Sequence, residues 1–175
     1  MVATAADQAL QESLRVLVCD DDAVMSSALS DLIRESPGLE LVGVATDALS
    51  AASLAVETSP DVVLLDVRMP GGGGPHAAQL IHERLPDARL IAFSAHADRR
   101  IVLQMLRAGA VEYLVKGIDS DVAITDAIRR TGRGHLSLSL AETEELVFDL
   151  VEMLRQVQTA TAPAAADLHA GAGDR

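Results

Sequence analysis

Five segments with the pattern of a buried β-strand alternate along the chain with five segments that have the pattern of an amphipathic helix. The strands, short runs of β-branched and leucine residues, are expected at 15–20, 39–45, 62–66, 89–94 and 111–115. The helices are expected at 23–35, 48–57, 75–85, 99–108 and 121–131. Such alternation predicts an α/β fold with a parallel sheet covered on both faces. Right-handed crossovers leave few topologies, and we expect a flavodoxin-like, doubly wound five-stranded sheet of order 2-1-3-4-5.

Polar and turn residues mark where the helices should begin and end. Asp22, Asp47 and Asp98 stand directly before helical segments and are expected to be N-caps. Gly109 is expected to stop the fourth helix. The four glycines at 71–74 carry no side chains and are expected to form a mobile loop after the third strand.

The composition divides the chain into one folded domain and flanking segments. The domain is expected at 14–134, after a polar, alanine-rich lead-in at 1–13 that is expected to be disordered. Residues 135–159 are expected to form a C-terminal amphipathic helix, and the low-complexity residues 160–175 a disordered tail. The apolar seam of that helix has heptad-like spacing and consists of Leu140, Val147, Leu150, Leu154 and Val157. Such a seam either packs back on the domain or pairs with a second copy.

The charge and composition exclude several classes of protein. The net charge of −12 argues against nucleic-acid binding by this chain, because duplex affinity comes largely from Lys and Arg. The arginines are scattered, and Arg129 and Arg130 are expected on a solvated helix face. A single cysteine, Cys19, rules out an internal disulfide and fits a reducing compartment. The sequence contains neither a membrane-spanning apolar run nor a secretory signal, so we expect no membrane association and a cytoplasmic location.

Charged residues follow three of the expected strands. Asp20 and Asp21 end the first, Asp66 ends the third, and Lys116, the only lysine, follows the fifth. The carboxyl ends of parallel strands meet at one edge of the sheet, where open α/β sheets bind their ligands. Three acids and one cation at that edge predict a small pocket for a divalent metal and a phosphoryl group.

Four separated motifs resemble one known family, the receiver domain of two-component response regulators. The motifs are Val16-Leu17-Val18-Cys19-Asp20-Asp21-Asp22, Asp61-Val62-Val63-Leu64-Leu65-Asp66-Val67-Arg68-Met69-Pro70, Ser94-Ala95 and Tyr113-Leu114-Val115-Lys116. They occur in order at the expected strand ends, and the resemblance covers about residues 14–133.

The resemblance implies a role for each matching residue. Asp66 corresponds to the phosphoacceptor, which attacks the phosphorus of a phosphohistidine and becomes an acyl phosphate. Asp20, Asp21 and Asp66, with the backbone carbonyl of Arg68, correspond to the Mg²⁺ ligands. Mg²⁺ suits such a site because it binds carboxylate and phosphoryl oxygens and retains water. Lys116 corresponds to the lysine that pairs with a phosphoryl oxygen.

Other matching positions concern switching and rate. Ser94 corresponds to the hydroxyl that acts in catalysis and switching, and Tyr113 to the aromatic residue that changes rotamer with it. Arg68 and His96 stand two residues after Asp66 and Ser94, at the mouth of the family's pocket, and are candidates for tuning the phosphoryl lifetime. The sequence departs from the family at Gly117, where many receivers have a proline, so this loop is expected to be looser.

The resemblance predicts a phosphorylation-dependent response regulator that signals through protein–protein interaction or dimerisation. Its partners would be a histidine kinase or phosphotransfer protein and a second copy, paired through the C-terminal helix, the helix four–strand five–helix five face, or both. Such a chain is not an enzyme beyond its own phosphorylation and dephosphorylation. One alternative is the N-terminal receiver of a larger regulator whose output domain, DNA-binding or enzymatic, lies elsewhere.

Two further alternatives are a degenerate receiver that acts as a scaffold and an Mg²⁺-dependent phosphohydrolase with an aspartate nucleophile. The intact set of acids, serine and lysine argues against the first. Hydrolases of the haloacid-dehalogenase type have a second acid two residues after the nucleophile, where this chain has Arg68. No cap domain is recognisable in the sequence either, so both features argue against the hydrolase.

Overall fold

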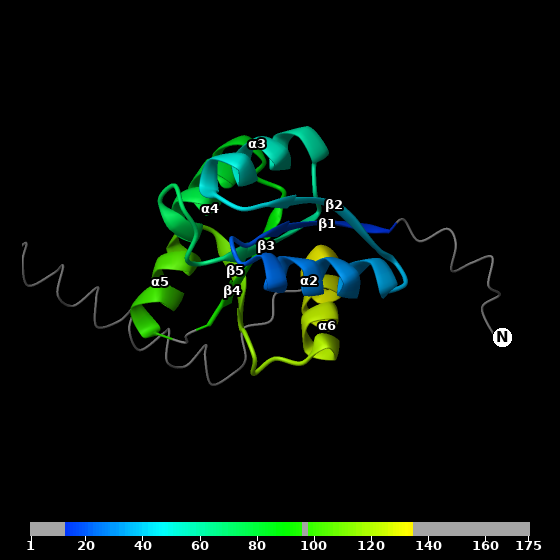
Figure 1. The fold of residues 1–175 in the computed structure, drawn as a ribbon. Helices are drawn as coiled ribbons and strands as arrows, with labels where there is room; N and C mark the ends of the chain where they lie inside the picture. The colour runs from blue at the N-terminus through cyan, green and yellow to red at the C-terminus, as the bar shows by residue number, and fades with distance from the viewer. Residues whose placement is uncertain (1–12, 96–97, 135–175) are drawn as a thin grey trace, which may run out of the picture. The chain divides into compact units, whose positions relative to one another are not determined.

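A computed structural model describes residues 13–95 and 98–134 (Figure 1). These residues form one five-stranded parallel sheet of order β2-β1-β3-β4-β5, which confirms the predicted topology. The strands are β1 (Leu14–Cys19), β2 (Leu39–Ala45), β3 (Val62–Asp66), β4 (Arg89–Ser94) and β5 (Ala110–Val115). The helices are α2 (Ala23–Glu35), α3 (Ala48–Thr58), α4 (Gly73–Arg84), α5 (Arg99–Arg107) and α6 (Asp121–Gly132).

Helices cover both faces of the sheet, and each face has its own apolar core. On one face, α3, α4 and α5 pack on the sheet mainly through alanines, with larger side chains such as Ile81 and Met105. On the other face, α2 and α6 pack through branched residues such as Ile33 and Ile128 (Figure 1). All five residues of β3 are buried, which explains why its sequence is a continuous apolar run rather than an alternating pattern.

Aspartate side chains cap three of the helices, as the sequence predicts. The carboxylate of Asp22 accepts hydrogen bonds from the backbone amides of the second and third residues of α2. Asp47 caps α3 in a reciprocal capping box with Ser50, and Asp98 accepts from the amide of Arg100 in α5. Gly109, with φ of +103°, follows the end of α5 as expected.

The start of α4 differs from the prediction. It begins at Gly73, two residues before the predicted start, whereas the other helix and strand boundaries agree within one residue. The cause is the backbone of the glycine run, where Gly71, Gly72 and Gly73 have φ of +82°, +105° and +75°. Glycine adopts such angles without steric cost, and the chain therefore turns directly into the helix. The mobility expected for this loop stays a prediction.

Gly74 lets α4 approach the end of β3 closely. A Cβ atom at this position would lie 2.5 Å from the carbonyl oxygen of Asp66 and 2.9 Å from the Cα atom of Val67. The amide of Gly74 also donates a hydrogen bond to the carbonyl oxygen of Val67 at 2.9 Å. The first turn of α4 thus packs directly on the backbone that carries Asp66.

An ion pair between an exposed arginine and a buried glutamate joins β5 to α6. Glu112, which is 5% exposed, accepts hydrogen bonds from Arg130 Nη2 at 2.6 Å and from Thr131 Oγ1 at 2.7 Å. Arg130 is exposed, as expected for a solvated helix face, but its guanidinium also supplies the hydrogen-bonded partner that the buried carboxylate of Glu112 needs. Arg129, which is half-buried, contacts Asp126 and the carbonyl oxygen of Pro37.

Several predictions concern residues outside the described ranges. The lead-in at 1–13, except its last residue, the helix at 135–159 and the tail at 160–175 all fall there. The chain divides into two compact units, 1–138 and 139–175, and the described residues all belong to the first. Within the described ranges, none of the helices has the length and apolar character needed to cross a bilayer.

We predict that Gly74→Ala lowers the free energy of unfolding by about 2 to 3 kcal/mol, because the new methyl group overpacks a contact between two backbones. Gly38→Ala is the control, since a Cβ there meets nothing within 4 Å and only the positive φ opposes it. That strain should cost about 1 to 2 kcal/mol. Urea unfolding measures both variants. If Gly74→Ala costs no more than Gly38→Ala, α4 does not pack on the end of β3 as described.

Candidate functional site

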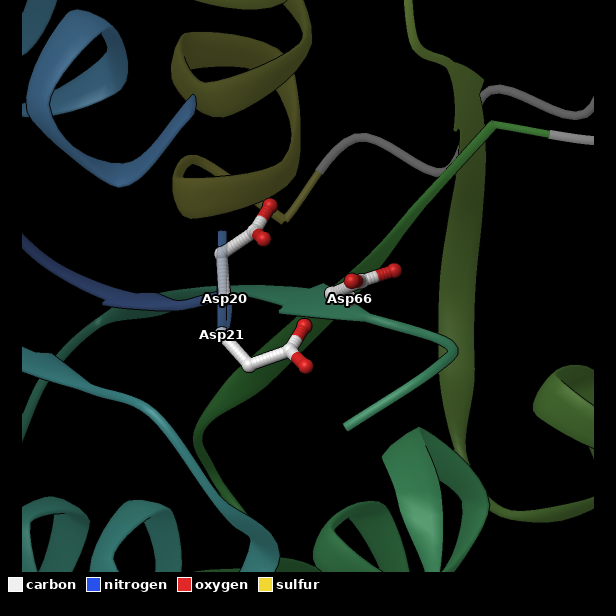
Figure 2. Close-up of side chains that lie close together, drawn as sticks. All are labelled: Asp20, Asp21 and Asp66. Atoms are coloured by element: carbon white, nitrogen blue, oxygen red, sulfur yellow. The ribbon is translucent and has the colours of Figure 1, made fainter. Parts of the chain in front are cut away.

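Three carboxylates meet at the carboxyl ends of the neighbouring strands β1 and β3, as the sequence predicts. Cys19 of β1 lies opposite Leu65 of β3 in the sheet register, so Asp20 and Asp66 are the next residues on neighbouring strands. Figure 2 shows these two side chains with Asp21 beside them. One oxygen of each carboxylate lies within 4.8 Å of the other two.

Two of the three acids are buried. Asp20 is 1% and Asp66 7% exposed, whereas Asp21 lies at the surface. Each buried carboxylate accepts a hydrogen bond from the amide two residues further along the chain. Asp20 Oδ1 accepts from Asp22 at 3.0 Å, and Asp66 Oδ1 from Arg68 at 3.2 Å. These local turns orient both side chains and leave the Oδ2 atom of each carboxylate available to another partner.

The ammonium group of Lys116 binds both of those second oxygens. Its Nζ lies 2.6 Å from Asp20 Oδ2 and 3.0 Å from Asp66 Oδ2. The Nζ atom also lies 5.6 Å from the ring centroid of Phe93, a residue of β4, the strand between β3 and β5 in the sheet. The backbone amide of Lys116 donates to the carbonyl oxygen of Ser94 at 2.8 Å, which extends the β4–β5 pairing to this residue. The predicted meeting of the acids and the lysine is therefore present in the structure.

The pKa values of this cluster follow from burial and pairing. Burial lowers the pKa of Lys116, but hydrogen bonds to Asp20 and Asp66 raise it by more, and the net value lies above the ordinary 10.5. Its stabilising contribution is therefore complete below the unfolded-state value and is lost only as the pH rises through the folded-state value. Burial also raises the pKa of Asp20, against the opposing effect of its hydrogen bond to Lys116.

The donor set fits a hard divalent cation. Carboxylate oxygens are the ligands that Mg²⁺ and similar ions prefer, and Asp20, Asp21 and Asp66 offer one each. The nearby Cys19 does not suit a softer metal, because burial and then the charge of Asp20 raise the pKa of its thiol far above the ordinary range. The residues present therefore fit a site for an Mg²⁺-type ion.

Ser94 and Tyr113 lie next to this cluster. Ser94 ends β4 and is 1% exposed, and Tyr113 on β5 is half-buried. Burial raises the pKa of Tyr113, a side-chain hydrogen bond with Ser94 opposes this, and the charge of Asp66 raises the pKa further. The phenol of Tyr113 is thus linked to Ser94 and lies within electrostatic reach of Asp66.

The remaining predicted site residues are placed differently. Arg68 is exposed, and its described contact with the cluster is the backbone amide that donates to Asp66. His96 lies outside the described residues. One residue near the cluster was missed: Asp119, whose carboxylate accepts from the amide of Val115 at 2.6 Å. Its place in the sequence, three residues after the strand-end lysine, does not by itself indicate a hydrogen bond to a backbone amide of the preceding strand.

Residues 16–129 match the family described as the response regulator receiver domain. The chain therefore belongs to this family, and the resemblance noted in the sequence is confirmed. This match spans the whole described sheet except the first residues of β1.

Curated relatives include regulators and enzymes. The chain is 35% identical over 125 residues to the transcriptional regulatory protein LiaR of Bacillus subtilis, covering 71% of this chain and 59% of LiaR. It is 36% identical over 157 residues to protein-glutamate methylesterase/protein-glutamine glutaminase 3 of Myxococcus xanthus, covering 88% of this chain and 42% of that protein. The chain thus spans about half the length of these relatives.

Solved structures of receiver domains share the fold. The response regulator domain of Thermotoga maritima CheB is 32% identical with a TM-score of 0.65, and the match covers 70% of this chain and 98% of that one. The signal receiver domain of the putative response regulator NarL from Mycobacterium tuberculosis is 32% identical with a TM-score of 0.68. This match covers 71% of this chain and 99% of that domain. Both similarities fall on a domain rather than on a whole regulator.

Proposed function

We propose that this chain is a phosphorylation-dependent switch that accepts a phosphoryl group on Asp66 from the phosphohistidine of a histidine kinase or phosphotransfer protein. The observation that carries the proposal is the bridge from Lys116 to Asp20 and Asp66 at the strand ends of a receiver fold. Such a bridge holds a nucleophilic carboxylate beside a cation that can pair with phosphoryl oxygens.

The proposed reaction is a direct transfer between two residues. A carboxylate oxygen of Asp66 attacks phosphorus, the bond from phosphorus to the histidine nitrogen breaks, and Asp66 becomes an acyl phosphate. Lys116, already within 3.0 Å of Asp66, pairs with a phosphoryl oxygen as charge moves onto the new group. Mg²⁺, held by Asp20, Asp21, Asp66 and the carbonyl of Arg68, would neutralise charge on the phosphoryl group.

The proposed output is a shift between two conformations. Phosphorylation would draw Ser94 and Tyr113 toward Asp66 and remodel the surface formed by α5, β5 and α6. What supports this is that Tyr113 is already hydrogen-bonded to Ser94 and is affected by the charge of Asp66. Arg68 and His96 remain the candidates for setting the lifetime of the acyl phosphate.

The proposal includes no catalysis beyond the chain's own phosphorylation and dephosphorylation, and it places the protein in the cytoplasm. A second possibility is that the chain is the receiver portion of a larger regulator, DNA-binding or enzymatic. The lengths of its relatives favour that possibility, because a transcriptional regulator and a methylesterase both extend well beyond the matched region. A phosphohydrolase is disfavoured by the exposed Arg68 where a second acid would be needed.

We also propose a homodimer, formed through the C-terminal helix expected at 135–159, the surface of α5, β5 and α6, or both. The apolar seam of that helix supports it, although the seam lies outside the described residues. The full chain should sediment as a dimer at micromolar concentration, and a chain that ends at Gly134 as a monomer. A full chain that stays monomeric at high concentration, with and without phosphorylation, would exclude this mode of output.

Phosphorylation itself can be tested with a small-molecule donor. In the presence of Mg²⁺, acetyl phosphate should add one phosphoryl group to the chain, as measured by intact mass, because Asp66 is the proposed phosphoacceptor and its carboxylate lies beside the cation of Lys116. Asp66→Asn should abolish the added mass, and chelation of Mg²⁺ should abolish it in the parent. Asp31→Asn, at an exposed acid on α2, is the matched control and should label normally. Labelling of Asp66→Asn at the parent rate would refute the assignment.

A further inference from the structure

The turn that follows Lys116 is closed by its own residues. The amides of Ile118 and Asp119 both donate to the carbonyl oxygen of Val115, at 3.2 and 3.1 Å. In return, Asp119 Oδ2 accepts from the amide of Val115 at 2.6 Å. Gly117, with φ of +77°, lets the chain reverse between them. Both backbone polar groups of Val115 are therefore bound by residues of this turn.

The amide of Val115 has no partner within the sheet. In a strand, successive amides point to opposite sides, and that of Lys116 points toward β4, where it binds the carbonyl oxygen of Ser94 at 2.8 Å. The amide of Val115 therefore points away from β4, and among residues 13–95 and 98–134 β5 is the last strand on that side. Edge amides of this kind are normally left to water or to another strand. Here the carboxylate of Asp119 accepts from the amide of Val115 instead, and a charged acceptor makes a short, strong hydrogen bond.

These contacts fix the backbone of Lys116 from both sides. Its own amide is held to β4, and the residue before it is held to Asp119 across the turn. From this backbone position the side chain reaches Asp20 and Asp66 at 2.6 and 3.0 Å. A proline at 117 could not close the turn in the same way, because its φ is fixed near −65° and the observed angle is positive.

We infer that Asp119 is a positioning residue that holds Lys116 in place for phosphoryl transfer to Asp66. This inference rests on the proposed function, since it concerns the lysine of the same site. The ammonium group of Lys116 is bound by Asp20 and Asp66, whereas the described contact of Asp119 is its hydrogen bond to the amide of Val115. What matters is the side-chain oxygen that accepts from Val115, so an asparagine should replace it and an alanine should not.

The first test compares rates of phosphorylation by acetyl phosphate in the full chain. Asp119→Ala should react about fivefold more slowly, the factor expected when one hydrogen bond no longer holds the group in position. Asp119→Asn should stay within about twofold of the parent, because it keeps the acceptor oxygen. Asp121→Ala removes the neighbouring exposed acid in the first turn of α6 and should have no effect on the rate.

A double-mutant cycle separates positioning from a general effect on folding. If Asp119 acts through Lys116, then Asp119→Ala should cause no further slowing in a Lys116→Met background. An equal slowing in both backgrounds would overturn the inference, as would Asp119→Ala reacting at the parent rate. A parent chain that takes up no phosphoryl group would instead refute the proposed function, and with it this role of Asp119.

Hydrogen exchange supplies a readout that does not depend on activity. The amide of Val115 should be protected in the parent and in Asp119→Asn, although it lies on the open edge of β5, and should exchange rapidly in Asp119→Ala. The amide of Lys116, which is bonded within the sheet, should stay more protected than that of Val115 in Asp119→Ala. Rapid exchange of Val115 in the parent would overturn the inference at its first step, whether or not the variants fold well enough for kinetics.

Discussion

A single ammonium group allows two carboxylates to be buried side by side at the end of the sheet. Asp20 and Asp66 are almost fully enclosed on neighbouring strands, and two unpaired charges in such a place would repel each other and lose their hydration. Lys116 offsets both costs by binding one oxygen of each. The bridge joins the ends of β1, β3 and β5, which are distant in sequence. The geometry of the proposed site therefore depends on the correct assembly of the sheet. The same cation is the group that would receive the charge of an incoming phosphoryl group.

Contacts in the surrounding loops and strands hold the residues of this bridge in place. Gly74 brings the first turn of α4 against the backbone of Asp66, and Asp119 closes the turn that begins at Lys116. Glu112, on the strand that leads to Lys116, is paired with Arg130 and fixes β5 to α6. Each contact involves a backbone group or a buried charge, and both are costly to leave unsatisfied. The site therefore depends on hydrogen bonding at the loop ends as much as on the apolar core beneath it.

Much of this arrangement could be predicted from the sequence, and the exceptions have a physical cause. The apolar run before Asp66 and the parallel topology placed its carboxylate beside Asp20, because the ends of parallel strands meet at one edge. The start of α4 at Gly73 could not be predicted, since it depends on backbone angles that glycine permits but does not require. The roles of Asp119 and Arg130 were missed for a similar reason. Each binds a group from a different element or an edge amide, and such partners become evident only when the fold is known.

The most direct test of this account is the stability of Lys116→Met as a function of pH, without Mg²⁺. At pH 7 the variant should lose about 3 kcal/mol of unfolding free energy, because two buried carboxylates are left without their cation. Burial already raises the folded-state pKa of Asp20, and the loss of its hydrogen bond to Lys116 should raise it further. The folded variant then binds more protons than its unfolded chain, and the deficit relative to the parent should shrink as the pH falls toward 4. Arg34→Met, which removes an exposed pair with Asp31, is the control and should change stability by less than about 0.5 kcal/mol. A Lys116→Met protein as stable as the parent at pH 7, or one whose deficit is the same at both pH values, would contradict the account.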